Sequence, residues 1–308
     1  MFRPESTVAV AAGLTFAIVL WGGNNVGTKI LVGVWPPIWT GASRFLCAGL
    51  LLLALLRWTA WLGAHHSPSA RMRRALWLRG GLALAAYVAV FNWAVRYTSP
   101  SHVALYLGAA PVWALLWETA EDSRRLTLRQ VLAAVFALSG VAVLLWPVLH
   151  TTSIQLTGEV LGLGASVLWV AYGRQCRRLT TELGGAEVTA QSMWRAGVWL
   201  TPVGLFEVSQ SRLPLNWQLL GIQTYCVLAG GVVAFAIWNN ALRVWPTSQV
   251  LLFNNLIPIS TMVWSYFWLD ESVTPTFWVA MLLVATGVGL GLFKTAPKPT
   301  LTSLSQPE

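Results

Sequence analysis

Residues 92–105 read NWAVRYTSPSHVAL, and residues 239–252 read NNALRVWPTSQVLL. At a constant spacing of about 147 positions, the two stretches share an asparagine, an alanine, an arginine, a serine, a valine and a leucine. The same shift, without any gap, continues to pair residues toward the end of each half, namely Pro111 with Pro258, Trp117 with Trp264, Gly140 with Gly287 and Val141 with Val288. The chain is therefore built from two related halves.

The composition predicts an integral membrane protein. Of the 308 residues, 56% are hydrophobic and 10% are charged, and the mean hydropathy is +0.61. The polar faces of a water-soluble helical protein are missing, and continuous apolar runs such as residues 46–56 favour helices over the alternating strands of a β-barrel. Since a span needs about 20 mostly apolar residues, we expect an all-α protein with ten transmembrane helices. The expected spans are Val8 to Leu31, Pro37 to Trp58, Leu76 to Tyr97, Ser101 to Ala120, Leu126 to Pro147, Leu156 to Cys176, Val188 to Phe206, Trp217 to Leu242, Thr247 to Leu269 and Thr274 to Phe293.

Each half holds an odd number of expected spans, so the two halves must cross a bilayer with opposite orientations. This is the sequence pattern of an inverted-repeat transporter. We expect residues 1–150 to form the first five-helix repeat and residues 151–294 to form the second, inverted one. Residues 295–308 contain three prolines and no apolar run, so we expect a disordered cytoplasmic tail.

The net charge of +9 has an uneven placement along the chain. If the chain crosses ten times, nearly all basic clusters fall on one side, which the positive-inside rule assigns to the cytoplasm. The N- and C-termini are then both cytoplasmic, and the basic excess reflects topology and no nucleic-acid partner. The first span follows Arg3 but ends without a signal-peptide cleavage site, so we keep it in the mature protein.

Polar and aromatic side chains inside the spans are the candidates for substrate binding, because they usually face the bundle interior or a water-filled cavity. The set is Trp21, Asn24, Asn25, Tyr87, Asn92, His102, Tyr106, Trp169, Tyr172, Asn239, Asn240, Gln249 and Asn254. For the polar candidates other than Tyr87 and Tyr172, the alternative is that they form hydrogen bonds between helices that only hold the bundle together, worth about 0.6 kcal/mol each on average. For Trp21 and Trp169, which fall near the middle of their spans, the alternative is ordinary packing.

Two prolines, Pro111 and Pro258, fall inside the fourth and ninth spans and are counterparts in the repeat. A proline frees a carbonyl from its helical bond and permits a kink. Matched kinks are consistent with a hinge in each half, or with a packing accommodation that involves no motion.

Charged residues narrow the substrate class. No acid occurs between Glu5 and Glu118, which disfavours an exporter of lipophilic cations. Lys29, Arg44 and Arg195 are cations within or near spans that would suit a substrate carboxylate, although Lys29 can also snorkel to the interface. Without a carboxylate in mid-membrane, a proton relay has only weak candidates such as His102.

Other chemistry finds no support in the sequence. The three cysteines are isolated, and the pair His65-His66 lies in an exposed basic loop, so we expect no disulfide framework and no metal site. No catalytic triad or phosphate-binding glycine loop is present, so we expect neither a cofactor nor an enzyme.

Several short motifs occur in a characteristic order. They are Trp21-Gly22-Gly23-Asn24-Asn25 in the first span, Arg44-Phe45 in the second, and a threonine start followed by a Gly-Val pair in the last span of each half. The ordered set resembles the drug/metabolite transporter superfamily, in its ten-span branch with two EamA-type repeats. The Trp-rich composition is most similar to the bacterial aromatic amino acid exporters of that superfamily.

This resemblance implies that spans one, three, four, six, eight and nine surround a central cavity, with spans five and ten at the periphery. The first half departs from the pattern, because Arg124 stands where the second half has Glu271. We therefore interpret the acids at these joints as interface residues.

The expected function is alternating-access export of amino acids, preferably aromatic ones, across a bacterial inner membrane. The expected partners are a small-molecule substrate and membrane lipid. Two alternatives stay open: a broader drug or metabolite exporter of the same fold, and a channel or membrane scaffold without alternating access. The sequence leaves the oligomeric state and the energy coupling undetermined.

Overall fold

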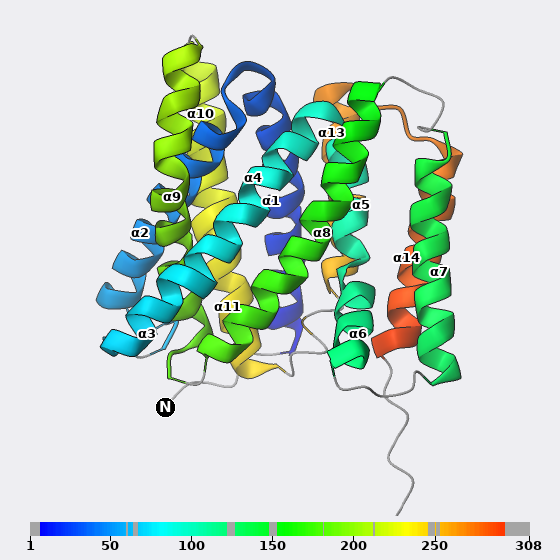
Figure 1. The fold of residues 1–308 in the computed structure, drawn as a ribbon, viewed down its shortest axis with the longest axis horizontal. Coiled ribbons are helices and arrows are strands. Elements are labelled where there is room, and N and C mark those ends of the chain that lie inside the picture. The colour runs from blue at the N-terminus through cyan, green and yellow to red at the C-terminus, as the bar shows by residue number, and fades with distance from the viewer. Residues whose placement is uncertain are drawn as a thin grey trace, which may run out of the picture.

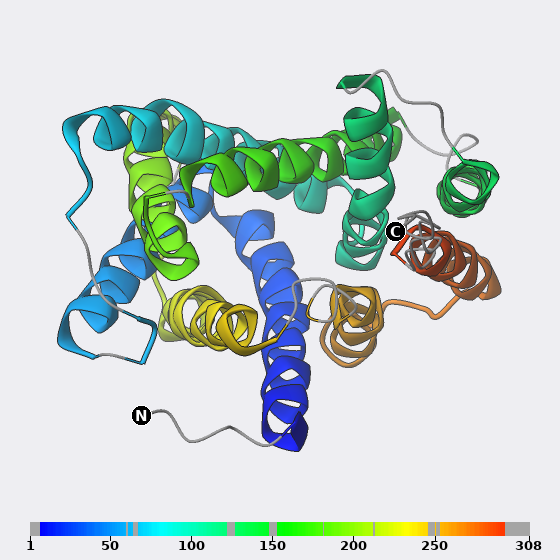
Figure 2. The same cartoon turned by 90° about the horizontal axis from the view of Figure 1, so that it is seen from below.

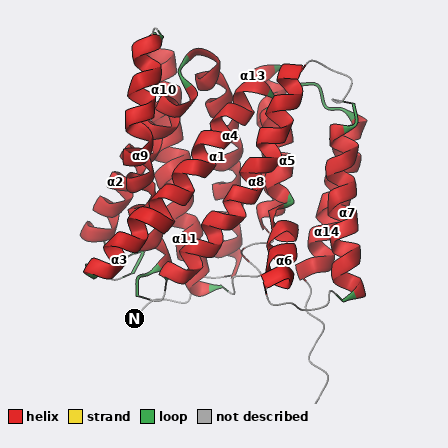
Figure 3. Cartoon of the chain, viewed as in Figure 1, coloured by secondary structure: helices red, strands yellow, loops and turns green. Residues whose placement is uncertain are grey.

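The computed structural model describes residues 7–59, 61–63, 67–121, 127–147, 153–180, 182–211, 213–245, 250 and 253–292. In these ranges all regular structure is helical (Figure 3). The helices run back and forth along one direction as a bundle, and α1 begins on the same side on which α14 ends (Figure 1).

Most helices fall within the predicted spans, but the expected number of ten membrane-crossing helices is not confirmed. The first half contains α1 (Thr7–Val34), α2 (Pro37–Trp58), α3 (Ala70–Ala75), the π-helical turn η1 (Leu76–Gly81), α4 (Leu82–Tyr97), α5 (Pro100–Gly108), α6 (Ala110–Glu121) and α7 (Leu128–Leu145). The second half contains α8 (Ser153–Leu179), α9 (Gly185–Gln210), α10 (Trp217–Tyr225), the π-helical turn η3 (Cys226–Val233), α11 (Ala234–Val244), the short 3₁₀ turn η4 (Phe253–Leu256), α13 (Ile257–Leu269) and α14 (Pro275–Leu292).

Six helical stretches of the described chain are long and apolar enough to cross a membrane. They are Thr7–Val34, Pro37–Trp58, Ala70–Tyr97, Leu128–Leu145, Gln155–Leu179 and Trp217–Leu242. The other expected spans differ for physical reasons. The fourth is broken into α5 and α6, and α13 in the ninth is only 13 residues long. In the seventh, α9 carries Glu187, Arg195 and Glu207, which lower its hydropathy. The apolar helix of the tenth, Pro275–Leu290, is also shorter than a full span.

Both predicted hinge prolines lie where a helix restarts. In the fourth span α5 ends at Gly108 and α6 begins at Ala110, one residue before Pro111. In the ninth span η4 ends at Leu256 and α13 begins one residue before Pro258. A proline is tolerated in a first helical turn, where its missing N–H has no intrahelical partner. The two halves thus share an interruption at matching positions, and motion at this point remains a prediction.

The two halves pack against each other through counterpart helices. In the contact of α2 with α9, an added Cβ on Gly49 would lie 2.3 Å from the Trp194 nitrogen, and one on Gly197 would lie 2.5 Å from the Leu46 nitrogen. These backbones therefore touch directly, as small residues allow in membrane bundles. A large cluster of buried apolar side chains surrounds this contact, including Ala48.

The contact of α7 with α14 follows the same rule. A Cβ on Gly140 would lie 2.7 Å from the Ala280 oxygen, and one on Gly287 would lie 2.6 Å from the Ala133 oxygen. Seen from below, these two helices form a pair at the edge of the bundle (Figure 2). This is the peripheral position expected for the last span of each half.

Candidate functional site

A cavity of about 1440 Å³ lies between the two halves and is lined by α1, α2, α4, α8, α9, α11 and the interrupted helices of the fourth and ninth spans. Its wall includes Arg177 and Thr180 at the end of α8, and Gly185 and Thr189 near the start of α9. These helix ends lie on the side where α1 begins and α14 ends (Figure 1). The cavity therefore reaches that side, which we call the terminal side.

Aromatic rings form two groups along the wall. In the first, from α4 and α8, the Tyr87 ring centroid lies 4.9 Å from that of Trp169, and Trp169 lies 5.6 Å from Tyr172. In the second, from α1 and α11, the Trp21 centroid lies 5.1 Å from Phe235 and 5.2 Å from Trp238. Such groups offer flat apolar faces to a ring-bearing ligand.

The π-helical turn η3 helps to fix Trp21. Its indole Nε1 donates a hydrogen bond of 3.0 Å to the carbonyl oxygen of Gly230, a residue of η3 that also lines the cavity. π-Helical turns leave backbone groups displaced from the regular ladder and are frequent at functional sites. A backbone acceptor in the cavity wall thereby sets the orientation of a predicted substrate-binding ring.

Polar groups line the cavity beside Trp21. Asn25 donates through Nδ2 to the Thr261 hydroxyl at 3.0 Å, which links α1 to α13. Arg44 of α2 donates through Nη1 to the Thr28 hydroxyl at 2.6 Å and to the Asn24 amide oxygen at 3.4 Å. The wall thus combines aromatic faces with amide groups and one buried guanidinium.

Most of the candidate site residues from the sequence line this cavity. They are Trp21, Asn24, Asn25, Tyr87, Trp169, Tyr172, Asn239 and Asn254. Asn92 is fully buried away from it and donates to the Pro37 carbonyl at 2.7 Å. Asn240 instead lines a separate hollow of about 330 Å³ beside α1. Gln249 lies outside the described residues.

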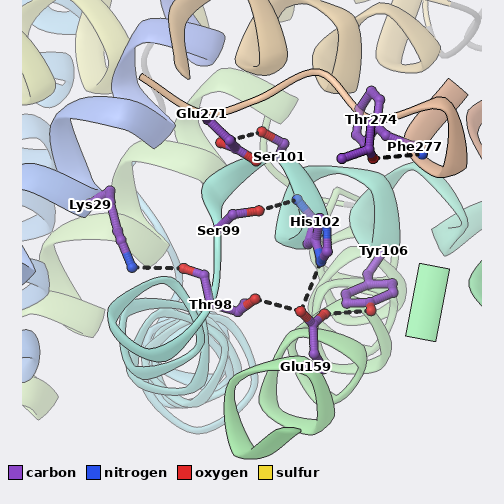
Figure 4. Close-up of polar contacts among 10 residues, drawn as sticks. All are labelled: Lys29, Thr98, Ser99, Ser101, His102, Tyr106, Glu159, Glu271, Thr274 and Phe277. Atoms are coloured by element: carbon purple, nitrogen blue, oxygen red, sulfur yellow. Dashed lines mark hydrogen bonds and ion pairs between the residues drawn. The ribbon is translucent and has the colours of Figure 1, made fainter. Parts of the chain in front are cut away.

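His102 and Tyr106 point at a carboxylate that the candidate set does not contain. Glu159 of α8 has no exposed surface, its Oε1 lies 2.8 Å from His102 Nδ1, and it accepts hydrogen bonds from the Thr98 and Tyr106 hydroxyls (Figure 4). From the sequence we found no carboxylate inside the membrane spans that could take part in a proton relay, and so we missed Glu159. Its signal was present in the sequence, since Glu159 falls inside the sixth expected span.

A layer of polar contacts spans the bundle on the side away from the termini, and we call it the polar layer. Lys29 Nζ donates to the carbonyl oxygens of Arg96 and Thr98, at 3.1 and 2.8 Å. The Ser101 hydroxyl donates to Glu271 at 2.7 Å (Figure 4). Together with the bonds to Glu159, these contacts join α1, α4, α5, α8 and the connection between α13 and α14 at that end of the bundle.

The three candidate cations have different environments. Lys29 is held in the polar layer by two backbone carbonyls. Arg195 binds Gln191 on its own helix, and its guanidinium lies 4.2 Å from the ring centroid of Trp194. Of the three, Arg44 is the one that lines the cavity.

Comparison with known proteins identifies the family to which this chain belongs. Residues 9–146 and again residues 156–293 match the EamA-like transporter family. The chain belongs to this family. It carries two EamA repeats within the drug/metabolite transporter superfamily, as the resemblance in the sequence implied.

Curated relatives of this EamA-like transporter cover most of its length at low identity. It is 27% identical to an uncharacterized transporter, YyaM of Bacillus subtilis, over 77% of this chain and 79% of the relative. It is 25% identical to a probable terminal-alkyne amino-acid exporter of Streptantibioticus cattleyicolor, over 83% and 87%. It is 21% identical to a probable amino-acid metabolite efflux pump of Escherichia coli, over 95% and 96%.

A solved crystal structure has the same fold. It aligns with a TM-score of 0.63 at 17% sequence identity, covering 92% of this EamA-like transporter and 96% of the other chain. The arrangement of helices around the cavity is therefore one that a solved protein also adopts.

Proposed function

We propose that this chain is a secondary transporter that exports amino acids, preferably aromatic ones, across a bacterial inner membrane by alternating access. The observation that carries the proposal is the cavity, which has aromatic walls, lies between the two halves and reaches the terminal side. Two of the relatives are named as amino-acid exporters or efflux pumps, which supports the substrate class.

The wall chemistry suits a zwitterion with an apolar ring. Stacking on rings such as Tyr87 and Trp169 contributes about 0.5–1.5 kcal/mol beyond the burial of area. The amides of Asn24, Asn25 and Asn239 can accept from an ammonium group and donate to a carboxylate. The cavity wall therefore offers polar groups for the ammonium and carboxylate groups of an aromatic amino acid and apolar rings for its side chain.

The arrangement of open and closed ends supports alternating access. In the proposed topology ten spans form two inverted halves, and the positive-inside rule puts both termini in the cytoplasm. The cavity then opens to the cytoplasm, whereas Lys29, Ser101 and Glu271 of the polar layer do not line it, so we propose that this layer is the closed end. A channel would need a continuous path, so the closed end favours a carrier.

The size of the cavity favours a second candidate, a broader drug or metabolite exporter of the same fold. Pockets for drug-sized ligands usually measure about 300–1,000 Å³, and this cavity of about 1440 Å³ exceeds that range. Competition between ligands of different size separates the two candidates.

The test is transport by the purified full chain in proteoliposomes. We expect uptake of labelled phenylalanine to be inhibited by unlabelled tryptophan more than by alanine, and to be stimulated by phenylalanine loaded on the opposite side. Stimulation from the opposite side identifies a carrier. Inhibition only by a lipophilic cation, or equal inhibition by unrelated metabolites, would contradict amino acid export.

A further inference from the structure

We propose that Arg44 binds the carboxylate of the transported substrate, so that the cavity selects carboxylates and zwitterions over amines. The inference rests on the proposed function insofar as the cavity is the substrate site. It adds a substrate class and a residue that recognises it.

The first argument is the burial of the Arg44 charge. The residue is 4% exposed and lies in α2, inside a candidate membrane span. Within the described parts of the chain, no carboxylate oxygen lies within 4.0 Å of its guanidinium. A buried charge is costly unless it is paired and hydrogen-bonded. A substrate carboxylate entering the cavity would supply the missing opposite charge.

The second argument is the hydrogen-bonding capacity of the guanidinium. Its donors to oxygen atoms of the described residues all come from Nη1, which binds the Thr28 hydroxyl and the Asn24 amide oxygen. A guanidinium has five N–H donors arranged as a fork that fits a carboxylate in two parallel hydrogen bonds. The bonds to Thr28 and Asn24 hold one arm of the fork, the Cys226 sulfur is a third, weak acceptor beside the guanidinium, and the remaining N–H groups are available to a ligand.

The third argument is position. Arg44 lines the same cavity as Tyr87 and Trp169, and its guanidinium carbon lies 4.9 Å from the ring centroid of Phe45, which also lines the cavity. A ring stacked on the pair of Tyr87 and Trp169 would therefore share the cavity with the guanidinium, as binding of an aromatic amino acid by both groups requires.

The fourth argument is that Lys29 and Arg195, the other cations proposed for this role from the sequence, are engaged elsewhere. Lys29 donates to two backbone carbonyls in the polar layer. Arg195 is stacked on Trp194 and bonded to Gln191, and neither residue lines the cavity. Of these three cations, Arg44 is therefore the one placed to bind a carboxylate in this cavity; Arg174, Arg177 and Arg178 also line it, in the second half of α8.

The experiment measures ligand binding to the purified full chain by quenching of tryptophan fluorescence. The probes are L-phenylalanine, 3-phenylpropanoate, which lacks the ammonium group, and phenethylamine, which lacks the carboxylate. For the wild type we expect binding of the first two probes and at least about tenfold weaker binding of phenethylamine, because hydrogen bonds to charged groups are worth about 1.5–3 kcal/mol.

Variants of Arg44 test whether this residue causes the preference for carboxylates over phenethylamine. Arg44→Gln should weaken binding of phenylalanine and phenylpropanoate by about tenfold or more and leave phenethylamine binding unchanged. Arg44→Lys, which keeps the charge but loses the fork, should fall between the wild type and Arg44→Gln. The matched control is Arg79→Gln, an exposed arginine that does not line the cavity.

Each outcome decides the proposal. Unchanged carboxylate binding in Arg44→Gln, or a wild type that prefers phenethylamine, overturns the role of Arg44 and leaves amino acid export standing. If the wild type binds phenylpropanoate but no amino acid, and Arg44→Gln abolishes that binding, the carboxylate site stands and amino acid export fails. The probe series on the wild type tests the selectivity for carboxylates even if one variant does not fold, and the second Arg44 variant then tests the residue.

Discussion

His102 Nδ1 lies 2.8 Å from Glu159 Oε1, and this contact joins the first turn of α5 to α8 across the boundary between the two halves of the chain. Both oxygens of the carboxylate are engaged, because the Thr98 and Tyr106 hydroxyls also donate to it. Glu159 is thus a fully satisfied buried acid that fixes the start of the interrupted fourth span. It does not line the cavity.

Replacing Glu159 with glutamine should destabilise the protein. The amide NH₂ would face groups that now donate to the carboxylate, and a buried donor left without a partner costs about 1–3 kcal/mol. We expect a lower melting temperature in detergent for Glu159→Gln. Glu182→Gln is the control, because Glu182 is exposed and accepts a hydrogen bond from the exposed Ser69 side chain. Equal melting of both variants and the wild type would contradict a structural role for Glu159.

Removing an aromatic side chain that lines the cavity should impair transport without loss of folded protein. Alanine at Trp169 or Trp21 deletes a stacking surface worth about 0.5–1.5 kcal/mol beyond area burial, so the apparent affinity for phenylalanine should fall by about two- to tenfold. Proteoliposome uptake and size-exclusion chromatography measure the two quantities. Trp217→Ala, which removes an 89% exposed ring, should behave as the wild type. Unchanged uptake in both cavity variants would remove these rings from the site.

The polar layer should control access from the side away from the termini. Glu271→Gln removes the charged acceptor of the Ser101 hydroxyl and should favour opening there. The reporter is a cysteine at cavity-lining Ala104, in a chain with Cys47, Cys176 and Cys226 replaced, labelled from outside intact cells with an impermeant maleimide. We expect faster labelling in Glu271→Gln.

The control for the polar layer is Asp270→Asn. Asp270 is the neighbouring exposed acid and has a φ of 51°, a left-handed conformation that asparagine also tolerates. Its labelling rate should equal that of the unmodified reporter. A polar layer that does not gate access would give the same rate in Glu271→Gln.

The contact between α7 and α14 should not tolerate an added methyl group at its glycine positions. The Cβ of Gly287→Ala would lie 2.6 Å from the Ala133 oxygen and 2.7 Å from the Ala137 nitrogen, both backbone atoms that cannot turn away. We expect a loss of about 1–3 kcal/mol from overpacking, seen as a lower melting temperature. Gly289→Ala, where nothing lies within 4 Å, should be neutral. Neutral behaviour of Gly287→Ala would contradict the close approach.

Helix positions could be predicted from the sequence because their ends carry local signals. Span two was expected at Pro37 to Trp58, and α2 has these bounds, with prolines at its start and Arg57 and Trp58 at its end. The interruptions before Pro111 and Pro258 were also anticipated in kind, since a proline cannot continue the backbone ladder. Such features depend only on nearby residues.

The details of the site depend on contacts between distant residues, which the sequence pattern does not encode. Arg44 and Arg195 are both cations in apolar spans, and the packing of their helices turns Arg44 to the cavity and places Arg195 over the ring of the distant Trp77. Likewise Asn92 looks like Asn25 in the sequence, but it meets the Pro37 carbonyl of a neighbouring helix. The partners of Glu159 lie more than fifty positions away in the chain.

The glycine contacts of α2 with α9 and of α7 with α14 have an evolutionary and practical consequence. Each joins a helix to its own counterpart, so the surface is complementary to itself, as in the isologous interface of a two-fold symmetric dimer. A chain with such surfaces can arise by duplication and fusion of a gene whose product once paired with a second copy of itself. Residues 1–150 and 151–308, expressed as separate polypeptides, then retain what they need to find each other in the membrane.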